Sequence, residues 1–115
     1  MALKIFHNPR CSKSRQTLAL LTEAGHTPEI IQYLKDAPGE AEIRDILKLL
    51  GFDSARQLMR TGELIYKELN LKTVDDEDRL IRAMVENPKL IERPIVIKDG
   101  KAAIGRPPEN VMSLF

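Results

Sequence analysis

The sequence predicts an α/β protein built on a mixed four-stranded sheet. Three patterns indicate this. The chain opens with a strand, a helix and a second strand, continues through a purely helical middle, and closes with a hairpin and a short helix. A strand-helix-strand unit is parallel because its crossover is right-handed, whereas a hairpin is antiparallel. The sheet is therefore expected to contain both kinds of strand pairing.

The opening unit is delimited by clear signals. Residues 3–6 form a short apolar run typical of a buried strand. A helix is expected to begin near Ser12 and to end at Gly25, because glycine accommodates the left-handed backbone that often closes a helix. Residues 29–34 are the second predicted strand.

The middle of the chain alternates helices and turns. The segment 36–39 opens a helix whose apolar side chains share one face, and Gly51 ends that helix. The further predicted elements are a short helix capped by Asp53 or Ser54 and running to Met59, one or two helical turns in 65–71, and a helix that starts at Thr73, carries acidic residues in its first turn and stops at Asn87-Pro88.

The final part contains the hairpin. Residues 94–97 and 102–104 flank an Asp99-Gly100 pair, which is a strong signal for a tight turn, and a last short helix leads to Phe115. Apart from a helical insertion at about 38–86, this order of elements is that of a thioredoxin-like domain. We therefore expect one domain spanning residues 1–115.

Composition narrows the class of protein. The chain has 115 residues, with 18 Lys and Arg against 17 Asp and Glu, so its net charge gives no reason to expect nucleic-acid binding. It has no apolar run long enough to span a membrane and no signal-peptide pattern. One cysteine provides neither an internal disulfide nor a metal-ligand set. These features predict a soluble protein of the reducing cytoplasm, without a metal or a tightly bound cofactor.

Cys11, the only cysteine, lies where the first strand gives way to the first helix. A helix N-terminus and nearby cations both stabilise a thiolate and lower the pKa of the thiol. Arg10, Lys13 and Arg15 all lie within four residues of it. An inert core cysteine is the alternative, but this setting favours a reactive thiolate whose pKa lies below the value of about 8.5 for a free thiol.

Spacing excludes several cysteine chemistries. A phosphatase loop of the Cys-x5-Arg type would need arginine where Thr17 stands. A dithiol motif would need cysteine where Ser14 stands, so an external thiol would have to regenerate an oxidised Cys11. A protease of the Cys-His type is disfavoured because His26, the one distant histidine, is expected in an exposed turn.

Three segments together resemble the glutaredoxin-linked arsenate reductases of the ArsC/Spx family. They are the motif from His7-Asn8-Pro9 to Cys11 with Ser14-Arg15, the Arg93-Pro94-Ile95-Val96 segment, and Gly105-Arg106-Pro107. The resemblance extends over essentially the whole chain. It implies a thioredoxin-like fold in which Pro94 is a cis-proline facing the cysteine.

The resemblance also implies an activity and a set of roles. Cys11 would be the nucleophile that attacks arsenate, glutathione would be the co-substrate, and glutaredoxin would be the partner that completes the reduction to arsenite. The oxyanion would be bound by three arginines: Arg60, Arg93 and Arg106. Arginine suits this role because it stays charged and presents several donors to an oxyanion. Supporting roles would fall to His7, Asn8, Ser14, Arg15 and Pro94. We expect a monomer.

Some alternatives stay open at this point. Arg56, one helical turn away, competes with Arg60 for the anion-binding role, and His7 could be either structural or a source of positive potential. Arg10 and Lys13 could be plain surface residues, and Arg15 could pair with a carboxylate. Ser12-Lys13 replaces the Gly-Thr pair found after the cysteine in the best-understood enzymes of this family. A thiol oxidoreductase acting on another oxyanion or on glutathionylated proteins, and a non-catalytic Spx-like interaction module, are therefore the alternative functions.

Overall fold

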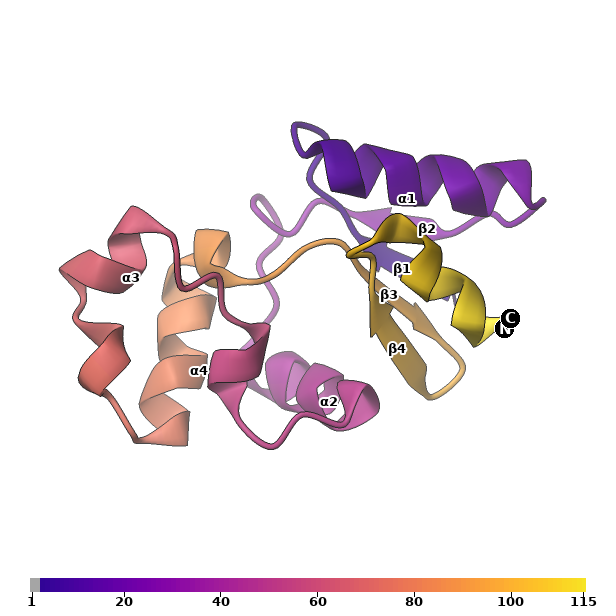
Figure 1. Cartoon of the computed structure of the whole chain (residues 1–115). Helices are drawn as coiled ribbons and strands as arrows, with labels where there is room; N and C mark the ends of the chain where they lie inside the picture. Colours follow the sequence, from indigo (N-terminus) through magenta and orange to yellow (C-terminus); the bar gives the residue numbers. More distant parts are fainter. Residues whose placement is uncertain (1–2) are drawn as a thin grey trace. The chain divides into compact units, whose positions relative to one another are not determined.

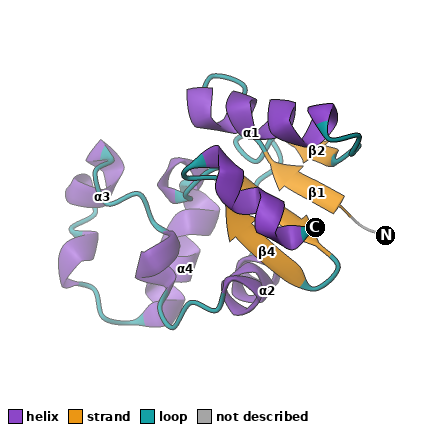
Figure 2. Cartoon of the chain, turned by 45° about the vertical axis from the view of Figure 1, so that its right-hand side comes forward, coloured by secondary structure: helices purple, strands orange, loops and turns teal. Residues whose placement is uncertain are grey.

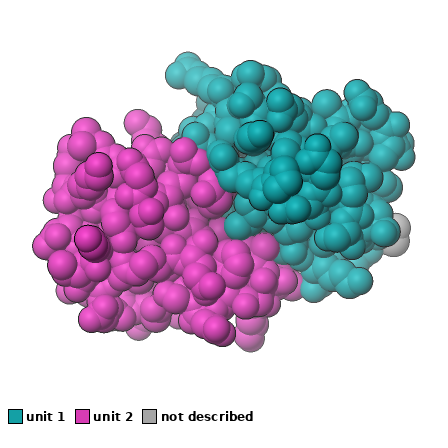
Figure 3. Space-filling view, in the orientation of Figure 1, with its two compact units in different colours: residues 1–36, 93–115 teal, residues 37–92 magenta. Residues whose placement is uncertain are grey.

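A computed structural model describes residues 3–115 of the chain. These residues form two compact units, shown in separate colours in Figure 3. The first unit combines the segment up to Asp36 with Arg93–Phe115, and the second consists of Ala37–Glu92. The expectation of one domain with an insertion at about 38–86 stays a prediction.

The first unit is built on a four-stranded sheet (Figure 1). Its strands are β1 (Leu3–Phe6), β2 (Glu29–Ile31), β3 (Ile95–Lys98) and β4 (Lys101–Ile104), in the spatial order β2-β1-β3-β4. β1 pairs in parallel with β2 and antiparallel with β3, and β3 and β4 form the antiparallel hairpin. The predicted mixed sheet is confirmed.

Two helices pack against this sheet through one apolar core. They are α1 (Ser12–Glu23) and the 3-10 helix η4 (Pro108–Leu114), both visible beside the strands in Figure 2. The side chains of the core come from both helices and from the two central strands: Ile5, Leu21, Val96, Val111 and Leu114. Burial of these apolar surfaces holds α1 firmly on the sheet, so the turn that precedes α1 has a fixed support.

Local structure in this unit differs from prediction at two places. β2 ends at Ile31 and not at Leu34, because the Gln32 carbonyl accepts hydrogen bonds from the amides of Lys35 and Asp36 and so turns the chain. The last helix is a 3-10 helix. The predicted hairpin turn is present, with positive φ at both Asp99 (45°) and Gly100 (79°), as a two-residue turn of this type requires.

The second unit is helical throughout. Its elements are α2 (Glu40–Leu50), η1 (Ala55–Leu58), α3 (Leu64–Glu68), η2 (Leu71–Thr73), α4 (Glu77–Glu86) and η3 (Pro88–Leu90). α2 and α4 are neighbours and bury apolar side chains such as Ile43, Ile46, Leu80 and Met84. This pairing gives the unit its own core.

The caps of the second unit follow the sequence signals with one exception. Ser54 caps η1 in a reciprocal capping box with Gln57, as one of the two predicted caps. The predicted start of α4 at Thr73 is wrong. Asp76 is its N-cap, because the Asp76 carboxylate accepts the Asp78 amide at 3.0 Å, while Thr73 belongs to η2.

Within residues 3–115 no helix combines the length and the apolar character that crossing a bilayer demands. In the same range no three or more His, Cys, Asp or Glu side chains are grouped so that they could hold a metal ion.

Candidate active site

Cys11 occupies the N-cap position of α1, at the end of the turn that leaves β1. Its amide donates to the Asn8 carbonyl at 3.0 Å, and its carbonyl accepts the Arg15 amide at 3.0 Å as the first hydrogen bond of the helix. The side chain is only 9% exposed. The thiol therefore lies beside the unpaired amides of the first helical turn, which carry the positive end of the helix dipole.

A buried polar network fixes the turn beneath the cysteine. The Ser14 hydroxyl is fully buried, contacts His7 Nδ1 at 2.6 Å and accepts the Asn8 amide at 3.0 Å. The Asn8 side-chain oxygen in turn accepts the Arg10 amide at 3.0 Å. Asn8 and Ser14 thus hold the backbone of the turn in one conformation, as buried polar groups do when their partners are in place.

His7 is a structural member of this network. Burial lowers the pKa of His7, and the nearby positive charge of Arg15 lowers it further, so the imidazole is neutral near pH 7. The lowered pKa disfavours His7 as a source of positive potential at the site and favours the structural alternative. Its side chain instead contacts Ser14, and its amide donates to the Ile31 carbonyl of β2 at 2.8 Å.

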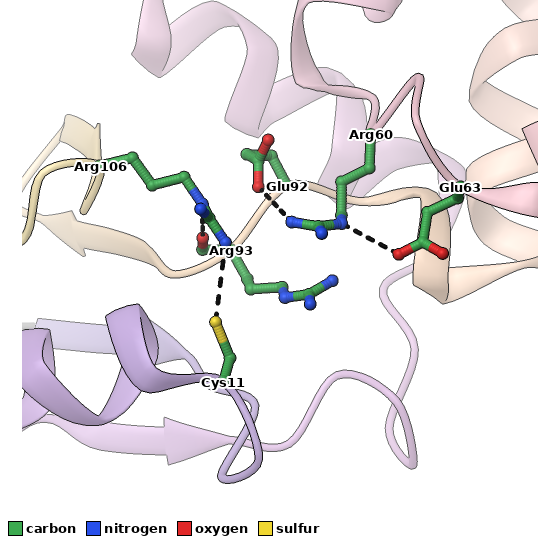
Figure 4. A network of polar contacts seen from close by, with 6 residues as sticks. All are labelled: Cys11, Arg60, Glu63, Glu92, Arg93 and Arg106. Carbon is green, nitrogen blue, oxygen red and sulfur yellow. Dashed lines mark hydrogen bonds and ion pairs between the residues drawn. The ribbon is translucent and has the colours of Figure 1, made fainter.

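Two arginines of the first unit act on the sulfur. Arg106 Nη2 lies 3.6 Å from Cys11 Sγ, and Arg106 Nε donates to the Arg93 carbonyl at 2.8 Å (Figure 4). The second contact orients the guanidinium toward the thiol. Arg93 acts on the thiol as a cation that lowers its pKa. The two arginines are therefore linked to each other as well as to the thiol.

The loops that carry these arginines are shaped by proline and glycine. Pro94 follows a cis peptide bond, as the family resemblance implied, and so does Pro107, which was not predicted. Gly105 donates its amide to the Pro94 carbonyl at 2.9 Å. A Cβ at Gly105 would lie 2.4 Å from Thr17 Oγ1 and 2.8 Å from Pro94 Cγ, so only glycine allows this close approach of the loop to α1.

The surroundings of Cys11 favour the thiolate. Burial raises the pKa of the thiol, but the Ser14 amide, the Arg93 guanidinium and the Lys13 amide together outweigh burial, so the pKa of Cys11 lies below its ordinary value. No regular capping hydrogen bond joins the sulfur to these amides, so they act on it through their field. The site therefore combines a nucleophilic sulfur with donors suited to an oxyanion.

Arg60 belongs to the second unit and is held by two carboxylates. Its Nε donates to Glu63 at 3.1 Å, and its Nη1 donates to Glu92 at 2.9 Å (Figure 4). Arg56 is committed elsewhere, because its guanidinium donates to the Tyr66 hydroxyl and to the carbonyls of Leu71 and Val74. These contacts hold together the loops of the second unit, which disfavours Arg56 as a residue that binds an anion.

The first unit thus brings together Cys11, Arg93, Arg106 and the supporting residues His7, Asn8, Ser14 and Pro94. Arg15 donates to the Pro9 carbonyl at 3.0 Å and, like Arg10 and Lys13, is exposed. Sequence reasoning missed Glu63 and Glu92. The only available signal was that each acidic residue lies near a candidate anion-binding arginine in the chain, a pattern too common to single them out.

A thioredoxin-like sheet with a thiol of lowered pKa at the first strand-to-helix turn, together with a cis-proline loop and two arginines, defines a class of thiol-dependent proteins. The chain belongs to the ArsC family, whose model matches residues 6–114.

The similarity to named relatives and to solved structures extends over nearly the whole chain. The chain is 52% identical to an arsenate reductase of Neisseria meningitidis, with 98% of this chain and 97% of that protein aligned. It is 58% identical to the Escherichia coli protein YfgD, which is described as uncharacterized, over 97% of this chain and 95% of that protein. The structure of an arsenate reductase from Vibrio cholerae is similar with a TM-score of 0.97 and 48% identity, covering 100% of this chain and 98% of that one.

Proposed function

We propose that this protein reduces arsenate to arsenite, with Cys11 as the nucleophile and with glutathione and glutaredoxin as the source of electrons. The observation that carries the proposal is a thiol of lowered pKa at a helix N-terminus with Arg106 Nη2 at 3.6 Å. The naming of relatives at about half identity as arsenate reductases supports the choice of arsenate.

The chemistry begins with the Cys11 thiolate. Its sulfur attacks the As(V) centre, an oxygen leaves as water after protonation, and a cysteine–arsenic bond forms. Arg93 and Arg106 balance the negative charge of the oxyanion as the sulfur approaches. The Ser14 and Lys13 amides, which lower the pKa of the thiol, would also serve as donors to the oxyanion.

Reduction requires two electrons, and external thiols supply them because the chain has one cysteine. Glutathione adds to the arsenic and displaces a second oxygen as water. A glutaredoxin thiolate then attacks the glutathione sulfur, forms a mixed disulfide and leaves As(III) on Cys11. Hydrolysis of the last sulfur–arsenic bond releases arsenite and restores the Cys11 thiolate.

The remaining roles in this proposal come from the family pattern. Arg60 would join Arg93 and Arg106 as the third oxyanion-binding arginine. The dependence on glutathione places the reaction in the reducing cytoplasm, and the protein would act as a monomer without a resident cofactor.

The deciding experiment measures arsenite formed from arsenate by the purified protein with glutathione, glutaredoxin and a recycling reductase. We expect turnover that requires each thiol component and is lost in Cys11→Ser. Ser12→Ala, which changes an exposed neighbour of the cysteine, is the matched control and should stay active. Absence of turnover with a glutaredoxin verified on another substrate would refute arsenate as the substrate. Formation of a Cys11–glutathione mixed disulfide under those conditions would then favour a thiol oxidoreductase with a different substrate.

A further inference from the structure

We infer that Glu63 and Glu92 are positioning residues that fix the Arg60 guanidinium and offset its charge. They thereby weaken the binding of anions at the site that Arg60 serves. The inference rests on the proposed function in one respect, namely that Arg60 is an oxyanion-binding residue. It goes further because it assigns roles to two acidic residues that the proposed reaction does not use.

The geometry around Arg60 is fixed on both sides. The two carboxylates receive different nitrogen atoms of the guanidinium, Nε at 3.1 Å for Glu63 and Nη1 at 2.9 Å for Glu92. Two donors bound in different directions leave the planar group little rotational freedom. Glu63 and Glu92 therefore determine where the remaining Arg60 donors point.

The backbone holds the same three residues in place. The Arg60 amide donates to the Leu90 carbonyl at 2.7 Å, the Glu92 amide donates to the Leu58 carbonyl at 2.8 Å, and a bridge joins Met59 to Ile91. The Glu63 amide donates to the Arg60 carbonyl at 3.2 Å. Backbone hydrogen bonds therefore fix the positions of Glu63 and Glu92 relative to Arg60.

Burial distinguishes this cluster from the other ion pairs of the second unit. The side chains of Arg60, Glu63 and Glu92 are 24%, 29% and 24% exposed. The pair Arg44–Asp78 is 47% and 64% exposed, and the pair Arg82–Glu40 is 60% and 45% exposed. Water screens partly buried charges less than exposed ones. The carboxylates on Arg60 therefore have a stronger electrostatic effect on a nearby anion than the exposed ion pairs have.

Two carboxylates lie against one guanidinium in this cluster. The three side chains line a cavity of about 380 Å³ together with Met59, Thr61 and Gly62. Arg60 is the only cationic residue of that lining. An anion approaching Arg60 from this cavity therefore meets well-placed donors beside two negative charges, which oppose its binding.

Glutamine variants separate position from charge, because glutamine keeps an oxygen that can accept from Arg60 but removes the negative charge. We would measure arsenate KM and kcat for Glu92→Gln and Glu63→Gln. Glu68→Gln is the matched control, since Glu68 is an exposed residue of the same unit and its replacement causes the same change in net charge.

Each of the two variants should lower the arsenate KM about three- to ten-fold, which is the effect of removing one partly screened negative charge from the guanidinium that binds the anion. The kcat should stay within about two-fold, because the change acts on binding, and Glu68→Gln should match the wild type. A purely structural role for the two glutamates would leave KM unchanged or raise it. Either of those results would overturn the inference.

The coupling to Arg60 is tested in an Arg60→Ala background. In that background, Glu92→Gln should no longer lower the arsenate KM, because the carboxylate acts through the guanidinium. An equal decrease in the arsenate KM without Arg60 would show that the carboxylate acts on the anion independently of Arg60, and would overturn the positioning role.

Failure of the proposed function is recognised separately. If the wild-type protein does not reduce arsenate, sulfate is the probe, and its affinity is measured by how well it protects Cys11 from iodoacetamide. Tighter sulfate binding in both glutamine variants would support the inference with a different substrate. Unchanged or weaker binding would overturn it regardless of the reaction.

Discussion

Replacing Ser14 by alanine tests whether the buried network holds the turn that carries the thiol. The Ser14 hydroxyl is fully buried and serves two partners, His7 Nδ1 at 2.6 Å and the Asn8 amide at 3.0 Å. Both partners belong to residues that are themselves buried, with His7 6% and Asn8 8% exposed. Alanine removes one oxygen and leaves both partners without that hydrogen bond.

The expected cost follows from these two losses. A buried polar group deprived of its partner costs about 1–3 kcal/mol. With two groups affected, and with alanine recovering up to about 0.5 kcal/mol through its better helix propensity, we expect Ser14→Ala to lower the free energy of unfolding by about 1.5–6 kcal/mol.

Urea denaturation followed by circular dichroism measures this difference, with Ser12→Ala as the matched control. Ser12 is the exposed first residue of the same helix, so its replacement should change the free energy of unfolding by no more than about 0.5 kcal/mol. If Ser14→Ala were no more destabilising than Ser12→Ala, the network could not be what fixes the turn. Our account of how Cys11 is positioned would then be wrong.

Two further predictions concern charge. Arg106→Gln removes a cation whose Nη2 lies 3.6 Å from Cys11 Sγ. Even with water-like screening, this contact stabilises the thiolate by roughly 1 kcal/mol. At a pH below the thiol pKa, alkylation of Cys11 by iodoacetamide should therefore be about five-fold slower in the variant than in the wild type. An equal slowing in Arg10→Gln would argue against a specific contact. The second prediction is a pH dependence of stability that arises from His7, whose pKa is lowered by burial and then by Arg15. Because the folded protein then binds fewer protons than the unfolded chain, stability should be complete above about pH 6.5 and fall as the pH drops from there toward the folded-state pKa. The unfolding free energy of His7→Gln should fall less between pH 7.5 and 5.5 than that of the wild type, and identical slopes would contradict the assignment.

Local signals were sufficient to predict most of the fold. Glycine at the end of α2, the Asp99-Gly100 turn and the alternation of apolar runs predict elements that the structure contains, because these features act over a few residues. They were less reliable where neighbouring hydrogen bonds compete. The Gln32 carbonyl ends β2 three residues early, and Asp76 caps α4 in preference to Thr73.

In the candidate site, too, the sequence predicts only what depends on residues close together in the chain. Cys11 could be singled out from the sequence alone because its helix N-terminus and its cationic neighbours are close in the chain. Arg93 and Arg106 required the family pattern, since they lie more than eighty residues from Cys11 and only the pairing of β1 with β3 and of β3 with β4 brings their loops back to it. The neutral state of His7 and the two carboxylates on Arg60 were decided by tertiary structure alone. Burial and ion pairing depend on which side chains the folded chain places together, and the order of residues along the chain does not specify this.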